Sequence, residues 1–351
     1  MGVGALLACA GKFKAAANRR ASKPLALVLL STLATGCGIV YTPTGKVISH
    51  YASDHVVPYV KATDDPDLAT CGTGLGQNHF VASFSRVMDD PAYVMFYNNL
   101  LSGYCADSKA AEANLRYLRA RRAGNVAEAS DARTEEKRWH TVTAKRRQQA
   151  FQEAVSIYAL PDSGECPRLR DDSDQITYLL ALVTGLQAVQ SDFLSGAQVG
   201  VPRNIAINAG RAAECLDNEK WWGVPRAIQA TVWNFVPGTT PEGVSPWRVY
   251  EQSAELAERS GMRLALALWA TGAQNQGNDE QLRLALRAAG AIDPASTPEE
   301  YRLIDRLATV QLRHLSDQVW TEMAGERTPM GALGRFPDDA QENVPDTEGL
   351  L

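Results

Sequence analysis

The stretch Ser173-Asp-Gln-Ile-Thr-Tyr-Leu-Leu-Ala-Leu-Val-Thr-Gly-Leu-Gln-Ala-Val-Gln-Ser-Asp192 decides the fold class. Its large apolar residues recur at intervals of three or four, which places them on one face of an α-helix. They are Ile176, Leu179, Leu180, Val183, Leu186 and Val189. No part of the sequence shows the sustained apolar–polar alternation that is typical of strands. We therefore expect helices.

The flanking sequence has the same character. Upstream, apolar residues keep helical spacing over 80–104, and a charged, alanine-rich stretch over 107–159 is interrupted at Gly124-Asn125. Downstream, short helices end at glycines such as Gly261 and Gly277, and Thr297-Pro298-Glu299-Glu300 has the pattern of a capping box that starts a last helix. We expect an all-α fold of antiparallel helix pairs in a tetratricopeptide-like solenoid, although no strict repeat of about 34 residues is present.

The composition divides the chain into four segments. We expect a signal peptide over 1–36 and a lipid tether with an irregular lead-in, rich in Gly, Pro, Thr and Asp, over 37–76. A helical repeat-like domain follows over 77–324, and a disordered tail over 325–351.

A secretory signal opens the chain. The apolar run from Leu25 to Ala34 is too short to span a bilayer core of roughly 30 Å. It ends at Ala34-Thr35-Gly36-Cys37, which resembles a bacterial lipobox and predicts lipid on Cys37; an ordinary cleaved signal or an uncleaved anchor is the alternative. Gly38, in place of Asp, favours the outer over the inner membrane. We expect a lipid-anchored protein on the periplasmic face of a bacterial envelope. Basic residues precede the run, namely Lys12, Lys14, Arg19, Arg20 and Lys23.

Charge and length limit the function. The chain has 351 residues and a formal net charge of −5, and loss of the signal, with five basic and no acidic residues, takes the charge to −10. An acidic chain of this kind is not expected to bind nucleic acid. Its length suits one large or two modest domains.

The cysteines fit an exported protein. Four follow Cys37, namely Cys71, Cys105, Cys166 and Cys215, and an even number predicts two disulfides. Four cysteines permit three pairings. Proximity in sequence favours Cys71–Cys105 and Cys166–Cys215. No CxxC spacing and no suitably placed histidine indicates a metal site.

Motifs of enzyme chemistry are missing from the sequence. The five histidines form no HExxH, and there is neither a GxSxG nor a P-loop motif. Gly72-Thr-Gly-Leu-Gly76 follows no predicted strand, so we interpret it as a turn beside Cys71. We expect no enzyme activity and no cofactor.

Residues 109–147 carry eleven Lys or Arg against five acidic residues. One interpretation is a patch for anionic lipid headgroups or an acidic partner, with Trp139 at the interface. The other is a solvated helical hairpin held by pairs such as Glu112 with Arg116.

Aromatic residues cluster further on. They are Trp221, Trp222, Trp233, Phe235, Trp247 and Tyr250. They either fill the core between helices or line a cavity for an apolar or carboxylate-bearing ligand. For the second case the candidate ligand-binding residues are Trp222, Trp233, Trp247, Tyr250 and Arg226.

The C-terminal half resembles the TatT family of lipoproteins, the T components associated with TRAP transporters. The resemblance rests on Pro237-Gly238, Glu242-Gly243, Pro246 and the helix Val249–Ala257, followed in order by Met262–Trp269 and Leu282–Pro294. It covers residues 175–324 in detail and 78–324 in organisation. It implies a tetratricopeptide-like solenoid, a homotrimer with a pore through each subunit, and a periplasmic solute-binding protein as partner. The family's motifs are structural and transfer no catalytic residue.

Together these features predict a lipid-anchored helical protein that binds or relays a small hydrophobic or organic-acid ligand with a periplasmic solute-binding partner. The alternative is a structural envelope adaptor without a ligand. A ligand carrier should contain an apolar tunnel near Trp222, Trp233 and Trp247, and an adaptor a filled core.

Overall fold

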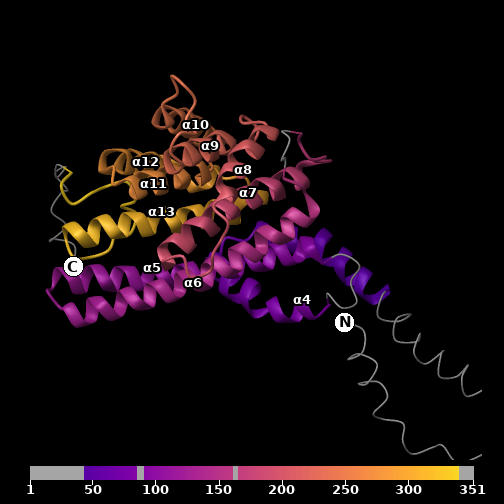
Figure 1. The fold of residues 1–351 in the computed structure, drawn as a ribbon, viewed down its shortest axis with the longest axis horizontal. Coiled ribbons are helices and arrows are strands. Elements are labelled where there is room, and N and C mark those ends of the chain that lie inside the picture. Colours follow the sequence, from indigo (N-terminus) through magenta and orange to yellow (C-terminus); the bar gives the residue numbers. More distant parts are fainter. Residues whose placement is uncertain (1–42, 85–90, 161–164, 340–351) are drawn as a thin grey trace, which may run out of the picture.

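A computed structural model describes residues 43–84, 91–160 and 165–339 (Figure 1). Within these ranges the chain forms helices and no strands, so the all-α prediction is confirmed. The tetratricopeptide-like solenoid stays a prediction. The helices are η1 Ala52–Val56, α3 Val57–Lys61, η2 Leu68–Leu75, α4 Asn78–Phe84, α5 Ala92–Arg122, α6 Val126–Ile157, α7 Asp172–Ser195, α8 Asn204–Ala212, η3 Ala213–Cys215, α9 Val224–Phe235, α10 Pro246–Ser260, α11 Leu264–Gln276, α12 Asp279–Ala291, η4 Pro294–Ser296, η5 Glu299–Tyr301 and α13 Arg302–Met323.

The longest element is the hairpin of α5 and α6, which runs along one side of the molecule (Figure 1). The predicted break at Gly124-Asn125 is its turn. Gly124 has φ +70°, which favours glycine, and the Asn125 side chain accepts a hydrogen bond from the backbone N–H of Glu128 at 3.2 Å. Gly124 and Asn125 therefore form the turn at which the charged stretch reverses direction.

Helix α7, predicted from Ser173 to about Asp192, is the centre of the core and spans Asp172–Ser195. Asp171 caps its first turn by accepting from the N–H of Asp174, and Gly196 in the left-handed conformation ends it. Gly185 is required by close packing, because a β-carbon there would lie 2.8 Å from the ring of Phe151 on α6 and 2.9 Å from Ile205 on α8. The apolar stripe of α7 is buried on several sides by neighbouring helices.

The C-terminal half packs on α7 as short helices, and α13 lies between them and the α5–α6 hairpin (Figure 1). Gly261 and Gly277 end α10 and α11 in the left-handed conformation, as predicted. The prediction of a capping box at Thr297 is wrong. The Thr297 hydroxyl instead donates to the Gly261 carbonyl, and α13 begins later, at Arg302.

A buried ion pair fixes this part of the fold. Arg263 Nη1 lies 2.6 Å from Asp305 Oδ2, and both residues are almost fully buried. The Arg263 guanidinium also donates to the carbonyls of Ala289 and Ile292. The pair therefore joins the start of α11 to the end of α12 and to α13, and its remaining hydrogen-bonding groups are satisfied.

The irregular lead-in predicted up to residue 76 is wrong for its described part, which is helical from residue 43. Two of its turns, η1 and η2, are π-helical, a form that is rare and enriched at functional sites. The disulfide Cys71–Cys105 joins η2 to α5. Gly74 permits this contact, because a β-carbon there would lie 2.5 Å from that of Leu101. We call residues 43–84 the N-terminal cover.

The disordered tail predicted from residue 325 is wrong for residues 325–339. Phe336 is only 3% exposed and lies beneath the guanidinium groups of Arg283 and Arg287. Trp320 Nε1 donates to the Arg335 carbonyl at 2.9 Å. This segment packs on α12 and α13, where the Phe336 side chain is buried.

Both disulfides have the pairing that proximity favoured, Cys71–Cys105 and Cys166–Cys215. The predicted signal peptide and the lipidation residue Cys37 lie outside the described residues.

Candidate ligand-binding cavity

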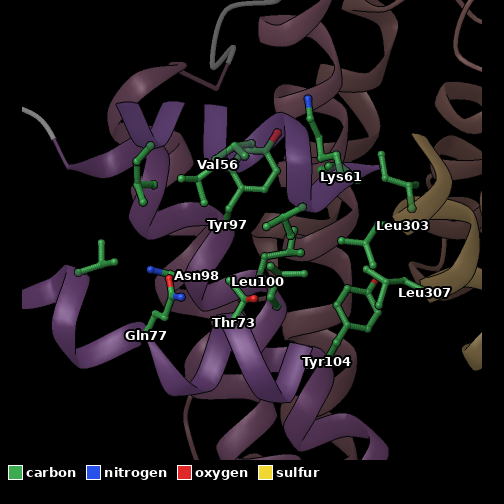
Figure 2. A pocket seen from close by; sticks show the side chains of 18 of the residues that line it. Val56, Lys61, Thr73, Gln77, Tyr97, Asn98, Leu100, Tyr104, Leu303 and Leu307 are labelled. Atoms are coloured by element: carbon green, nitrogen blue, oxygen red, sulfur yellow. The ribbon is translucent and has the colours of Figure 1, made fainter. Parts of the chain in front are cut away.

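An apolar cavity of about 190 Å³ lies between the N-terminal cover and helices α5, α7 and α13 (Figure 2). We call it the apolar cavity. Its wall comes from segments far apart in sequence, such as Val56 of η1, Leu100 of α5, Val183 of α7 and Leu307 of α13. A mainly apolar cavity of this size is large enough for a small ligand, since an engineered apolar cavity of about 150 Å³ binds benzene.

The first turns of α5 form one wall of the apolar cavity. They read Ala92-Tyr-Val-Met-Phe-Tyr-Asn-Asn-Leu-Leu101, with apolar side chains all around the helix, so α5 is buried against the cover on one side and α7 on the other. Tyr97 is held by a hydrogen bond of 2.9 Å between its hydroxyl and Thr177 on α7. Burial raises the pKa of the Tyr97 hydroxyl well above its usual range, so it stays protonated.

Few polar groups interrupt this wall. Asn98 is 5% exposed, and its side-chain NH₂ has no hydrogen-bond partner among the described residues. An unpartnered buried donor is costly, and a ligand oxygen would satisfy it.

Lys61 is the cation of the apolar cavity. Burial lowers the pKa of its amino group, and the negative charge of Glu300 opposes this in part. Figure 2 shows the amino group at the edge of the lining side chains, directed away from their middle. No ion pair of Lys61 is found in the described ranges, so its charge is open to a partner at the rim of the cavity.

These features suit the binding of an apolar ligand. The wall contains no histidine, carboxylate or thiol within the part of the chain that the structure describes. It offers apolar surface, the side-chain amides of Gln77 and Asn98, and one amine. An apolar chain that carries a carboxylate matches this set.

The candidate residues predicted from sequence lie elsewhere, and three of them belong to two aromatic groups that pack between helices. Trp222 packs edge to face on Tyr301, with ring centres 4.9 Å apart. Tyr250 stacks on Trp269 at 6.3 Å, and Trp247 lies 6.0 Å from Tyr250. Packing between helices was the other interpretation of this cluster, and it describes the arrangement observed.

The remaining two candidates lie on the outer side of α9. Arg226 lies over the half-buried ring of Trp233 at 5.5 Å and donates to Gln229 at 2.8 Å. None of the five candidates lines the apolar cavity. A ligand role for them stays an untested prediction.

The basic stretch forms the α5–α6 hairpin, and Arg116, Arg133 and Arg147 have ion pairs within it. Arg116 lies 3.0 Å from Glu128 and 2.5 Å from Glu135 across the hairpin. Lys109 lies over the Trp139 ring at 4.5 Å. This pattern supports the interpretation of a solvated hairpin, although the predicted partner of Glu112 is wrong, since Glu112 pairs with Arg327.

Sequence reasoning missed the cover residues of the cavity. The segment from Val47 to Val60 contains apolar residues at helical spacing, which was the available signal. The π-turns of η1 shift that spacing by one residue, and the many Gly, Pro and Asp residues nearby made the segment look irregular. The partners of the cover, on α7 and α13, follow more than a hundred residues later and could not be inferred from it.

Three further findings concern the described ranges. No cluster of three or more His, Cys, Asp or Glu is placed to hold a metal ion there. None of the helices in these ranges has the length and apolarity needed to span a bilayer. Comparison of the chain with models of protein families, with curated proteins and with solved structures finds no match.

Proposed function

We propose that this protein is exported, held at the envelope by lipid on Cys37, and binds a small apolar monocarboxylate in the apolar cavity. It relays this ligand with a periplasmic solute-binding partner, as the resemblance to TRAP-associated lipoproteins implies. The same resemblance implies a trimer.

The observation that carries the proposal is the composition of the cavity wall. Aliphatic and aromatic side chains supply the driving force for burying a hydrocarbon chain, about 25 cal/mol for each Å² removed from water. The unpartnered NH₂ group of Asn98, the amide of Gln77 and the amine of Lys61 are polar groups of the wall that can pair with a carboxylate. Because the cavity is small, the apolar part of the ligand has about six to eight carbons.

Two other observations support the proposed location. Disulfides persist in oxidising compartments such as the periplasm, and both pairs of cysteines are bonded. The N-terminal cover begins six residues after Cys37, so a lipid there would hold the cavity close to the membrane.

Calorimetry with octanoate and 1-octanol tests the ligand class. We expect the full chain to bind octanoate more tightly than octanol, and Lys61→Met to remove that preference. Lys137→Met, which changes an exposed lysine of α6, is the matched control and should keep it. Val56→Trp fills the cavity and should abolish binding of both compounds.

Native mass spectrometry of the detergent-extracted protein tests the proposed trimer, the lipid and the presence of a bound ligand. It reports subunit number, co-purifying small molecules and the mass of a lipid that Cys37→Ser should remove. If the chain binds neither octanoate nor octanol and carries no small molecule, the adaptor without a ligand is the better interpretation.

A further inference from the structure

A second cavity of about 420 Å³ lies where α5, α6, α7, α11 and α13 meet. We call it the polar cavity, because its wall is rich in hydrogen-bonding side chains. Amides line it from four helices, among them Asn114 of α5, Gln190 of α7, Gln274 of α11 and Gln311 of α13. Its volume falls in the usual range for small-molecule sites, roughly 300–1,000 Å³.

Charges in this wall cancel. Each of its arginines faces an acidic residue of the same wall at hydrogen-bonding distance, so no full charge is left to attract an ion. The pairs are Arg147–Asp107 at 2.9 Å, Arg133–Glu136 at 2.8 Å and Arg121–Glu322 at 2.9 Å. The two histidines of the wall, His140 and His314, have pKa values lowered by burial, which favours their neutral forms.

Three buried groups in the wall have no hydrogen-bond partner within the described ranges. They are the Nε–H of Arg147, which is 4% exposed, the Nδ1 of His140, which is 9% exposed, and the side-chain oxygen of Asn114. The first is a donor, the last is an acceptor, and the histidine nitrogen takes either role with its tautomer. Such groups cost stability unless something enters the cavity and pairs with them.

A ligand for this wall must therefore be uncharged and must both donate and accept hydrogen bonds. Hydroxyl groups do both, and a sugar ring carries several of them in fixed directions. An anion would meet Asp107 and Glu136, and a cation would meet Arg133 and Arg147, so ions are disfavoured. We propose that the polar cavity binds a neutral saccharide of one or two rings, with Asn114, His140 and Arg147 as its central contacts.

The site is independent of the apolar cavity, so it is tested on its own. Saturation-transfer NMR of the full chain with glucose, maltose, trehalose, cellobiose and N,N′-diacetylchitobiose should show transfer to at least one sugar, whose affinity is then measured by calorimetry. Octanoate should not compete with it. Transfer to none of the five sugars would mean that the cavity holds only water and would overturn the proposal.

Variants separate a binding role from a structural one. Asn114→Leu and His140→Phe each remove an unpartnered polar atom together with a contact to Glu136, at 3.2 Å from Asn114 Nδ2 and 3.8 Å from His140 Nε2. The melting temperature should therefore change little while sugar affinity falls about tenfold or more. Gln149→Leu, at an exposed position of α6, is the control and should keep the affinity. Sugar binding that survives both cavity variants, or binding of sulfate or succinate that both variants abolish, would also overturn the proposal.

Discussion

The two cavities share helices α5, α7 and α13 and differ in almost everything else. The apolar cavity is covered by the N-terminal cover, and Lys61, the cation in its wall, has no ion pair among the described residues. The polar cavity is closed by α6 and α11, and its cations are paired. Tyr104 lies between them, since it lines the apolar cavity while its hydroxyl accepts from Gln187 and its ring lies 5.2 Å from the Arg147 guanidinium. Helix α5 therefore lines both cavities, with its first turns at the apolar cavity and its later residues at the polar cavity.

The largest expected effect concerns the disulfide that holds the N-terminal cover. Cys71 and Cys105 are 34 residues apart, and closing such a loop is worth about 3–4 kcal/mol in the chain-entropy model. The double variant Cys71→Ala/Cys105→Ala should lose amide-exchange protection over residues 43–84 and lose octanoate binding. Hydrogen-exchange mass spectrometry and calorimetry measure both.

The second disulfide is the matched control. Cys166 and Cys215, 49 residues apart, line neither cavity, so Cys166→Ala/Cys215→Ala should cost a similar free energy of unfolding while octanoate still binds. Equal loss of octanoate binding in the two double variants would show that the cover is not held specifically by Cys71–Cys105.

The next effect is expected at the ion pair of the polar cavity. Arg147→Met leaves Asp107, whose side chain is 30% exposed, without its partner and should lower the free energy of unfolding by about 2 kcal/mol, less than for a fully buried pair. In urea titrations the double variant Asp107→Leu/Arg147→Met should be more stable than Arg147→Met alone, because no unpaired charge remains. A double variant that is no more stable would mean that the ion pair is not the source of the loss.

Acid should weaken the fold through His140. Burial lowers the pKa of its imidazole, Asp107 and Glu136 oppose this, and Arg147 and Arg133 add to it. Below about pH 6.5 the unfolded chain therefore binds a proton that the folded chain does not, and stability falls with decreasing pH by at most about 1.4 kcal/mol per unit. Melting curves of His140→Phe should show a shallower fall between pH 6.5 and 5.

Above pH 7.5 the imidazole is neutral in both states, so the wild type and His140→Phe should there have parallel pH dependences. A slope between pH 6.5 and 5 that is the same in both proteins would contradict this role of His140. Burial also lowers the pKa of His314, so part of the pH dependence of stability should remain in the His140→Phe variant.

The smallest effect is expected at Lys61. Its amine has lost much of its hydration without an ion pair in return, so Lys61→Met should change the free energy of unfolding by less than about 1 kcal/mol, and in the stabilising direction. Urea titration measures the change. A loss as large as that of Arg147→Met would mean that Lys61 has a structural partner and would contradict the contrast between the two cavities.

Local signals predicted much of the fold. Gly124-Asn125, Gly261 and Gly277 act within one turn of the chain, where backbone geometry and a single side chain decide the outcome. Thr297 shows the limit of such signals. The sequence predicts that its hydroxyl caps the last helix, but that helix begins at Arg302, and the hydroxyl donates to the Gly261 carbonyl, 36 residues away in the chain.

The cavities could not be predicted in the same way. Leu100, Val183 and Leu307 each look like ordinary core residues in the sequence, and their common cavity exists because three helices and the cover meet there without filling the space. The polar cavity could not be predicted from the sequence either. Asp107 and Arg147 are 40 residues apart on two helices whose charged residues look like a solvated surface.

The sequence by itself determined the helical class and most of the turns, because each depends on composition or on residues near one another, and it favoured the disulfide pairing that the structure has. Only the tertiary structure decided where the chain is hollow. A cavity is a property of distant segments that fail to fill the space between them, and both its shape and its unpaired polar groups arise only when those segments are brought together.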